Sequence, residues 1–488
     1  MTLQRFLKVV SAQEMARIEK WAIEKGASEE AFVEAAGKKV AEAVIEFIEK
    51  RRLGKKVAMV IGKGNKGADA YAAGRFLLEE GFHVRAIPLF DAEDCSGLNR
   101  KMGDRFRKRL GHFDEGLKFQ DDALILDGLL GTGFKGKVEG ILEKAICKMN
   151  DSGKPIISID IPSGLNGSTG EIGGSAIHAQ ETVALGLPKI GFFLRDGWNC
   201  VGQVRVEDFG LSEEAIDQAQ ELAYFPLPSS LRLPPVMRTR HKYQAGYVLG
   251  IGGSKELTGA PKLTGLAALR AGAGIVRIFS RDAIGPCPLE LICSKWNEKQ
   301  WREEMKRAGA VFIGPGLGKA AAVKQWVKKE LKKITVPSVI DADALLPDLE
   351  YPKNAILTPH RGEALRLLGL KEMPLEELLF SKIMKFCERK RVIILLKGAP
   401  TFIFIPEKPP LISPFGDPGM ASAGTGDVLT GILAALLAQK MEPEEAAVLG
   451  AALHGIAGEI AAHHKTSYGL IASDLIDFLP QTFRTLIE

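Results

Sequence analysis

The stretch that decides the fold of the C-terminal half is Gly419-Met-Ala-Ser-Ala-Gly-Thr-Gly-Asp-Val-Leu-Thr-Gly431. Its glycines come immediately before an apolar pattern that predicts a helix from Gly426 to Leu437. Backbone N–H groups at such a helix start point outward, and the helix dipole adds positive potential. The stretch therefore predicts an anion site, with Asp427 placed to accept the proton of an attacking hydroxyl. The structural alternative is a tight turn followed by a favourable first-turn acid.

Short apolar segments that end in Gly-rich turns recur along the chain, and helical patterns follow them. They lie at residues 57–61, 83–89, 123–126 and 155–161, and again at 246–251, 274–279, 310–313, 338–341, 355–357 and 392–396. Alternating strands and helices build a parallel sheet with helices on both faces and ligands at the carboxyl ends of the strands. The alternation is typical of doubly wound α/β domains.

The alternation stops between residues 211 and 240, where the proline-rich stretch 225–235 favours an extended connector. We therefore expect two doubly wound, three-layer α/β domains. The predicted boundaries are residues 1–214 for the first domain, 215–235 for a Pro-rich linker and 236–488 for the second domain.

Composition narrows the class of protein. The 488 residues are 46% hydrophobic and 26% charged, as in an ordinary soluble protein. The 65 basic and 60 acidic residues are mixed along the chain, so the net charge of +5 gives no reason to expect nucleic acid or membrane partners. Six cysteines without CxxC spacing predict reduced thiols, neither disulfides nor structural zinc, and a cytoplasmic location.

The C-terminal half resembles one enzyme family through a series of motifs. Gly424-Thr-Gly-Asp427 is similar to the anion hole of ribokinase-like kinases, whose aspartate is the catalytic base. The motifs that narrow the match to the NAD(P)H-hydrate dehydratases are His241-Lys242, Gly252-Gly-Ser254, Gly259-Ala-Pro261, Gly314-Pro-Gly-Leu-Gly318, Asp341-Ala-Asp-Ala-Leu345, Leu357-Thr-Pro-His-Arg-Gly-Glu363 and Lys397-Gly-Ala-Pro-Thr401. The resemblance implies a ribokinase-like fold for this domain and a Rossmann-like fold for the first.

The implied reaction is the repair of hydrated NADH and NADPH. The C6 hydroxyl of the hydrate is phosphorylated by ADP or ATP with Mg²⁺ and then eliminated, and ADP yields AMP and phosphate. The resemblance implies that the hydrate contacts Ala260, Gly316, His360 and Asp427, and that the nucleotide contacts Lys397, Gly398, Ala399, Pro400, Thr401, Gly424, Thr425 and Gly426. His360 could instead be a structural hydrogen bonder, and Glu363 could either orient magnesium or cap the next helix.

The N-terminal half resembles the NAD(P)H-hydrate epimerase domain, which is often fused to the dehydratase and converts the R epimer into the S epimer that the dehydratase uses. The motifs are Gly62-Lys-Gly-Asn-Lys-Gly-Ala-Asp-Ala70, Asp127-Gly-Leu-Leu-Gly-Thr-Gly-Phe-Lys-Gly136 and Ser158-Ile-Asp-Ile-Pro-Ser-Gly-Leu165. The implied substrate contacts are Asn65, Lys66, Gly67, Ala68, Asp69, Gly131, Thr132, Gly133, Phe134, Lys135, Gly136, Lys137 and Asp160. Asp127 is implied as a catalytic residue and, with Ser163, as a potassium ligand. Family members tend to be oligomeric, so we expect a homo-oligomer.

One loop departs from the family pattern. The usual turn reads Asn-Asn-Gly-Gly-Asp-Gly, whereas this chain has Asn65-Lys-Gly-Ala-Asp-Ala70. Lys66 replaces a potassium-ligand asparagine, and Ala68 and Ala70 replace glycines. If either glycine position needs a positive φ, alanine there costs about 1 kcal/mol or more, or the turn has a different shape. Our hypothesis is that the Lys66 ammonium occupies or displaces the potassium position and pairs with Asp127, which makes this domain independent of potassium.

Two other readings remain open from the sequence. The N-terminal domain could have lost epimerase activity and serve as a binding or assembly module beside an active dehydratase. The C-terminal domain could be a ribokinase-like kinase for a small alcohol, in which case a stable phosphorylated alcohol would be the product. Asp127 and Asp160 could also be helix caps at strand ends.

Overall fold

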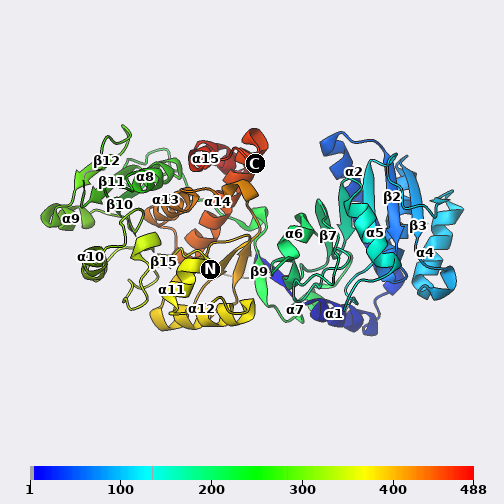
Figure 1. Ribbon diagram of the computed structural model, residues 1–488. Coiled ribbons are helices and arrows are strands. Elements are labelled where there is room, and N and C mark those ends of the chain that lie inside the picture. The colour runs from blue at the N-terminus through cyan, green and yellow to red at the C-terminus, as the bar shows by residue number, and fades with distance from the viewer. Residues whose placement is uncertain (1–4, 135, 283, 488) are drawn as a thin grey trace. The chain divides into compact units, whose positions relative to one another are not determined.

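The computed structural model describes residues 5–134, 136–282 and 284–487 (Figure 1). The chain divides into two compact units, one formed by Leu7–Ala223 and the other by the chain from Tyr224 onward together with Phe6. The expected linker, residues 215–235, contains the end of helix α7 (Glu213–Asp217) and the strand β9 (Ala223–Phe225). The division thus falls within a strand, ahead of the prolines.

The N-terminal unit is an α/β unit with one parallel sheet. Its strands are β1 (Leu7–Val9), β2 (Lys56–Ile61), β3 (His83–Pro88), β4 (His112–Phe113), β5 (Leu124–Gly128), β6 (Ile156–Ile159), β7 (Glu181–Leu185) and β8 (Gln203–Glu207). Its helices are α1 (Ala12–Glu24), α2 (Glu29–Arg51), α3 (Asn65–Glu79), α4 (Gly97–Lys108), α5 (Ile141–Asn150), α6 (Gly197–Val201) and α7. The sheet order is β4-β3-β2-β5-β6-β7-β8, without β1, and neighbouring strands are parallel.

Alternation along β2 explains the three layers of this unit. Val57, Met59 and Ile61 face the core shared with α2 and α3, whereas Ala58 and Val60 face the core shared with α5. Successive side chains of a strand point to opposite faces, so both faces of the sheet are buried. Figure 1 shows α5 and α2 beside this sheet. The predicted doubly wound, Rossmann-like fold is confirmed.

The C-terminal unit is also α/β. Its strands are β9, β10 (Tyr247–Ile251), β11 (Ile275–Ser280), β12 (Ile292–Lys295), β13 (Ala310–Ile313), β14 (Ser338–Ile340), β15 (Ile356–Leu357), β16 (Ile393–Leu396), β17 (Thr401–Phe404) and β18 (Leu411–Ser413). Its helices are α8 (Gly259–Arg270), α9 (Glu298–Met305), α10 (Ala321–Leu331), α11 (Arg361–Leu367), α12 (Glu376–Lys390), α13 (Thr425–Ala438), α14 (Pro443–Lys465) and α15 (Ala472–Ile487). From β9 the sheet order is β9-β18-β17-β16-β15-β14-β13-β10-β11-β12.

The expected all-parallel sheet is wrong at one edge of this unit, because β16, β17 and β18 are antiparallel. Only residues 397–400 connect β16 to β17. A parallel connection needs a dozen or more residues, so this short turn allows only a hairpin. The remaining core strands, from β15 to β12, are parallel as expected, and the ribokinase-like α/β class is confirmed.

Helix α14 has the length and composition of a membrane span, but 67% of its apolar window is buried inside the structure. Its buried face consists largely of alanine, leucine and glycine, and it packs with α13 and the sheet in the main core of the unit. Figure 1 shows α13 and α14 running beside each other. Burial of this kind is what a core helix of a folded domain shows.

The expectation of no disulfide is wrong, since Cys287 and Cys293 are bonded. Their Cα atoms are 6.5 Å apart, within the range a disulfide spans. The expectation relied on the lack of CxxC pairs, which says nothing about cysteines that a longer loop brings together. The other cysteines, Cys95, Cys147, Cys200 and Cys387, are free.

Candidate functional site

The start of α13 forms the centre of the candidate site in the C-terminal unit. Gly424 has a φ of 96°, and a Cβ there would lie 2.7 Å from Leu263 Cδ1, so only glycine fits. Asp427 follows in the first turn of the helix, and within the described residues no hydrogen bond engages its carboxyl group. Burial, with Asp341 as the next cause, raises the pKa of Asp427 to about 7. A carboxyl with this pKa suits a general base at neutral pH.

Lys397 faces the same helix start from the end of β16. Its Nζ donates to Asp341 Oδ1 at 2.8 Å and lies 3.8 Å from Glu363 Oε2. A Cβ on Gly426 would lie 3.1 Å from this Nζ, which places the ammonium beside the first turn of α13. Burial disfavours the charge, but Asp341 and Glu363 outweigh it and raise the pKa of Lys397. The lysine therefore stays cationic next to a predicted phosphate site.

Asp341 fixes the position of this lysine. Its second carboxylate oxygen accepts a hydrogen bond of 2.8 Å from Thr430 Oγ1, a side chain of α13. Only 2% of the Asp341 side chain is exposed. The carboxylate thus links the end of β14, the lysine after β16 and helix α13.

His360 and Glu363 form a capping box at the start of α11. The Glu363 backbone N–H donates to His360 Nδ1 at 3.3 Å, and the His360 backbone N–H donates to Glu363 Oε2 at 2.9 Å. This geometry matches the helix-cap alternative for Glu363. The His360 side chain is still 56% exposed, and His360 pairs with Lys397 in a parallel bridge. Its ring therefore stays accessible beside the lysine.

The remaining predicted residues of this unit lie at the same edge of the sheet. Gly316 has a φ of 68°, and a Cβ there would lie 3.3 Å from the Ala260 Cβ, so these two residues are neighbours. Residues 397–401 make the turn between β16 and β17. Ala260, Gly316, His360 and Lys397 follow the parallel strands β10, β13, β15 and β16, whose carboxyl ends share one edge.

A residue that the sequence did not single out holds the glycine-rich turn in place. His454 Nε2 is 2.8 Å from the Thr425 carbonyl oxygen. Burial lowers the pKa of His454 to about 4, so the ring is neutral and Nε2–H donates to this carbonyl. Thr425 Oγ1 donates in turn to the Met420 and Ser422 carbonyls. The signal for His454 was a lone histidine in the apolar pattern of α14.

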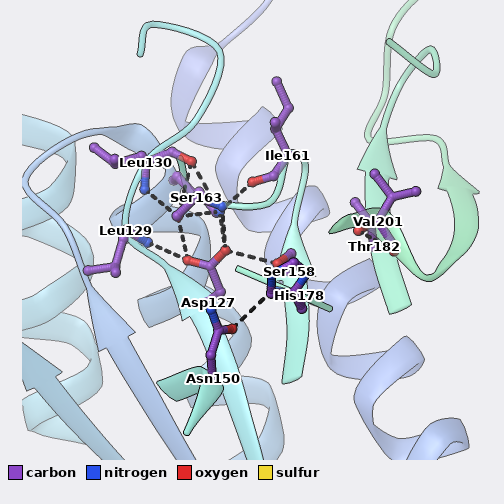
Figure 2. Close-up of polar contacts among 11 residues, drawn as sticks. Asp127, Leu129, Leu130, Asn150, Ser158, Ile161, Ser163, His178, Thr182 and Val201 are labelled. Carbon is purple, nitrogen blue, oxygen red and sulfur yellow. Dashed lines mark hydrogen bonds and ion pairs between the residues drawn. The ribbon is translucent and has the colours of Figure 1, made fainter. Parts of the chain in front are cut away.

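In the N-terminal unit, Asp127 is fully buried near the end of β5. Its carboxylate accepts hydrogen bonds from Ser158 Oγ at 2.9 Å, from Ser163 N at 2.9 Å and from Ser163 Oγ at 2.5 Å. The Leu129 N–H also donates to it at 3.1 Å. Figure 2 shows these groups converging on Asp127, with the Leu130 and Ile161 carbonyls close by. Asp127 is thus enclosed by these donors, and its catalytic role stays a prediction.

Lys66 completes this cluster. Its Nζ donates to Asp127 Oδ2 at 2.9 Å and lies 3.1 Å from Ser163 Oγ. It also donates to the Ile161 and Leu130 carbonyls, at 2.7 Å and 3.1 Å. The expected pairing with Asp127 is confirmed by this ion pair. The residues do not fit a potassium ion, because the lysine ammonium already lies between the two side chains predicted to bind it.

The predicted strain at Ala68 and Ala70 does not arise. Both alanines lie in α3, which begins at Asn65, and neither has a positive φ. Alanine is the most favourable residue in a helix. Residues 65–70 form the start of helix α3 in this chain.

A cavity of about 140 Å³ lies next to the Lys66 cluster. Its lining includes the predicted residues Asn65, Lys66, Asp69, Gly131, Thr132 and Asp160, together with Glu19, Ile23, Glu29, Phe32, Val33, Ala36, Leu185 and Phe209. The predicted residues that are not in this lining are Gly67, Ala68, Gly133, Phe134, Gly136 and Lys137, and Lys135 is outside the described residues. Gly67 packs instead against Asn99 and the Gly62 carbonyl, where a Cβ would clash.

Four carboxyl groups line the cavity, those of Glu19, Glu29, Asp69 and Asp160. Glu19, Asp69 and Asp160 bear on its chemistry, because Glu29 already accepts a hydrogen bond from Asn65. Asp160 has a φ of 61° and forms an ion pair with the buried Lys189 ammonium, which also donates to the Leu185 carbonyl at 2.9 Å. Burial and the nearby Asp160 raise the pKa of Glu19 to about 7. The same two causes raise the pKa of Asp69 well above its usual value. The cavity thus combines carboxyl groups that hold a proton with one ion-paired carboxylate.

The sequence did not identify Glu19 or Lys189 as site residues. Glu19 follows Met15 by one helical turn, on the side of α1 that is otherwise buried and apolar, and that position was an available signal. Lys189 follows β7, a strand that the sequence analysis did not predict.

Comparisons with known proteins match each half of the chain to a protein family. Residues 248–481 match a family described as NAD(P)H-hydrate dehydratase, and residues 29–191 match one described as YjeF-related protein N-terminus. A Bacillus subtilis ADP/ATP-dependent NAD(P)H-hydrate dehydratase, co-crystallised with ATP/Mg²⁺, is 30% identical to this chain. The match covers 52% of this chain and 94% of the B. subtilis chain, with a TM-score of 0.46.

Full-length relatives cover both halves at once. The bifunctional NAD(P)H-hydrate repair enzyme Nnr of Moorella thermoacetica is 34% identical over 94% of this chain and 93% of its own length. The Nnr enzyme of Escherichia coli is 33% identical over 86% of this chain and 84% of its own length. The chain belongs to the family of bifunctional NAD(P)H-hydrate repair enzymes.

Proposed function

We propose that the C-terminal unit dehydrates the S epimers of hydrated NADH and NADPH, with ADP or ATP as the phosphoryl donor, and that the N-terminal unit interconverts the R and S epimers. The observation that carries the first part is the Asp427 carboxyl, with a pKa of about 7, at the start of α13 and beside the cationic Lys397. The observation that carries the second is the cavity lined by Glu19, Asp69 and Asp160.

In the dehydratase reaction, Asp427 accepts the proton of the C6 hydroxyl as that oxygen attacks the terminal phosphorus of the nucleotide. The backbone N–H groups at the start of α13 stabilise the negative charge on the transferred phosphoryl group. Lys397 lies where it can neutralise charge on the donor phosphates. Phosphate then leaves C6 with the C–O electrons, the neighbouring C–H proton is lost, and the dihydronicotinamide ring is restored.

Mg²⁺ would neutralise charge on the nucleotide phosphates when bound. It takes hard oxygen ligands and usually combines one or two carboxylates with phosphate oxygens and water. Asp427 is kept for proton transfer, so its charged neighbour Asp343, whose Oδ2 accepts from the Gly318 N–H, is the carboxylate that would hold the ion through Oδ1. Glu363 is a poorer candidate, because the capping box already uses it.

In the epimerisation, a protonated carboxyl group of the cavity gives its proton to the C6 hydroxyl, which leaves as water. Water then adds to the opposite face of C6, and the ion-paired Asp160 accepts its proton. Glu19 is the proposed acid, because a pKa of about 7 lets it release and regain a proton at neutral pH. One C–O bond breaks and one forms, and transfer of the proton from Asp160 back to Glu19 through water closes the cycle.

Two assays test the dehydration by the C-terminal unit and the epimerisation by the N-terminal unit separately. Purified S and R hydrates of NADH are incubated with the enzyme, Mg²⁺ and either ADP or ATP, and recovery of dihydronicotinamide absorbance is followed together with release of AMP or ADP and phosphate. Interconversion of the separated epimers without nucleotide is followed by chromatography.

Rapid recovery from the S hydrate and enzyme-dependent interconversion support both proposals. Recovery from S without interconversion above the spontaneous rate would make the N-terminal unit a non-catalytic module. A stable phosphorylated alcohol without NADH recovery would contradict the dehydratase.

A further inference from the structure

The ammonium group of Lys66 lies inside a cage of oxygen atoms. Its four oxygen partners, at 2.7 to 3.1 Å, come from three separate segments: the end of β5, the loop after it and the turn after β6. The side chains of Lys66 and Asp127 are 3% and 0% exposed. A cation held this way connects parts of the chain that are far apart in sequence.

Burial lowers the pKa of Lys66, whereas Asp127 and the geometry of the cage favour the charged form of the lysine. The Leu130 and Ile161 carbonyls and the Asp127 carboxylate can only accept hydrogen bonds, so together they need all three hydrogens of an ammonium. A neutral amine has two hydrogens and cannot donate to all three of these acceptors at once. The carboxylate likewise needs a cation, because an unpaired buried charge is strongly unfavourable.

The three segments of the cage also build the cavity. The loop that supplies the Leu130 carbonyl continues into Gly131 and Thr132, and the turn that supplies the Ile161 carbonyl follows Asp160 directly. Gly131 approaches Lys66 closely, since a Cβ there would lie 3.5 Å from the Lys66 Cβ. The position of the lysine therefore sets where these cavity residues lie.

We propose that Lys66 is a covalently tethered cation that organises the epimerase cavity in place of a free monovalent ion, and that shortening this side chain turns the cage into a binding site for potassium or ammonium. Lys66 acts as a positioning residue, because its ammonium donates all of its hydrogens to oxygen atoms of the cage. Potassium and ammonium ions are of similar size and are both held by several oxygens, so either can replace the tethered group.

The decisive variant is Lys66→Asn, which removes the tethered charge and leaves a side-chain oxygen on α3 facing the cage. The matched control is Lys66→Met, which removes the charge but fills the same volume with an apolar chain. Thermal unfolding of the full chain is recorded in potassium, ammonium, sodium and choline chloride at equal ionic strength.

We expect no potassium-specific response from the wild-type protein. The N-terminal transition of Lys66→Asn should rise by roughly 5–10 °C when potassium or ammonium is about 100 times its dissociation constant. Lys66→Met should unfold early in all four salts. In crystals soaked in thallium(I), a potassium substitute, an anomalous peak should occupy the cage of Lys66→Asn and be absent from the cage of the wild type.

Epimerisation in the same salts adds an activity measurement that rests on the function proposed above. Lys66→Asn should regain most of its lost rate in potassium, while the wild type should be indifferent to the cation. If the wild type melts higher specifically in potassium, or binds thallium in the cage, the inference is wrong. The inference is also wrong if potassium does not raise the unfolding temperature of Lys66→Asn. Unfolding and thallium binding do not depend on catalysis, so an inactive N-terminal unit would leave them readable.

Discussion

The two units use the same pair of residue types in opposite ways. Lys66 donates to Asp127 at 2.9 Å, and Lys397 donates to Asp341 at 2.8 Å, so the two ion pairs have nearly the same geometry. The Lys66 and Asp127 side chains are 3% and 0% exposed, whereas those of Lys397 and Asp341 are 20% and 2% exposed. The first pair is closed off, and the second opens toward the start of α13.

The partners of each ammonium show what this difference means. Lys66 has four oxygen acceptors around it, which leaves no hydrogen for a substrate. The Lys397 ammonium makes one hydrogen bond within the described residues, to Asp341, and so has donors for a phosphate. A buried lysine thus has a structural role when all hydrogens of its ammonium are donated within the protein. It can bind a ligand when some of these hydrogens are still available. Substitutions in the two units should separate stability from catalysis.

The largest effect is expected for Asp427→Asn. Asparagine keeps the size of the side chain but cannot accept the hydroxyl proton, so the dehydration rate should fall by about 10²–10⁴-fold. Recovery of dihydronicotinamide absorbance from the S hydrate measures it. Epimerisation and the melting temperature should be unchanged, and a variant that retained more than a tenth of the rate would remove Asp427 from the role of base.

The next largest effect is expected for Lys66→Met, on stability. The substitution leaves the Asp127 carboxylate buried without its counter-ion, which should lower the free energy of unfolding of the N-terminal unit by about 3–5 kcal/mol. Denaturant titration, with the C-terminal transition as internal reference, measures it. An unchanged N-terminal transition would mean that the cage does not carry the stability assigned to it.

Lys397→Met should show the reverse pattern. Loss of the cation beside the donor phosphates should slow dehydration by about 100-fold, the cost of removing one transition-state donor. The free energy of unfolding should fall by less than half as much as for Lys66→Met, because Thr430 still donates to Asp341 and the site is open to water. Equal destabilisation by the two substitutions would contradict the comparison between the pairs.

The smallest effect is a pH dependence of the dehydratase. Asp427 must be ionised to accept a proton, and its pKa is raised to about 7. The value of kcat/KM should therefore fall about tenfold per pH unit below pH 7 and level off above it. A pH profile of the wild type measures this slope, and Asp427→Asn should lack it. A profile that stays flat down to pH 5 would show that another group is the base.

The fold was largely predictable where glycines mark the ends of apolar segments. The helix predicted from Gly426 to Leu437 is α13, Thr425–Ala438. It was predictable because a glycine-rich turn followed by an apolar run indicates the start of a buried helix. Strand β7 was missed because Glu181 and Thr182 interrupt its apolar pattern, although all five of its residues are buried. The sequence analysis predicted no strands after β16, so the antiparallel strands β17 and β18 were missed. The short segments that connect these strands carry no helical pattern.

The site was predictable where a single residue type carries the chemistry. The exchange of an asparagine for Lys66 predicted an ammonium beside Asp127, since a buried carboxylate needs a cation. The conditional cost at Ala68 and Ala70 does not apply, because both alanines lie in α3 and neither has a positive φ. Glu19 and Lys189 reach the cavity from segments far from the motifs, so only the fold brings them together.

The measurement that tests this account most directly is a progress curve in potassium-free buffer. A mixture of both NADH-hydrate epimers is incubated with the wild-type enzyme, Mg²⁺ and ADP, and dihydronicotinamide absorbance is followed to completion at several enzyme concentrations. We predict full recovery, with both phases proportional to enzyme and unaffected by added potassium. A curve that stops when the S epimer is exhausted, or resumes only when potassium is added, would contradict the account.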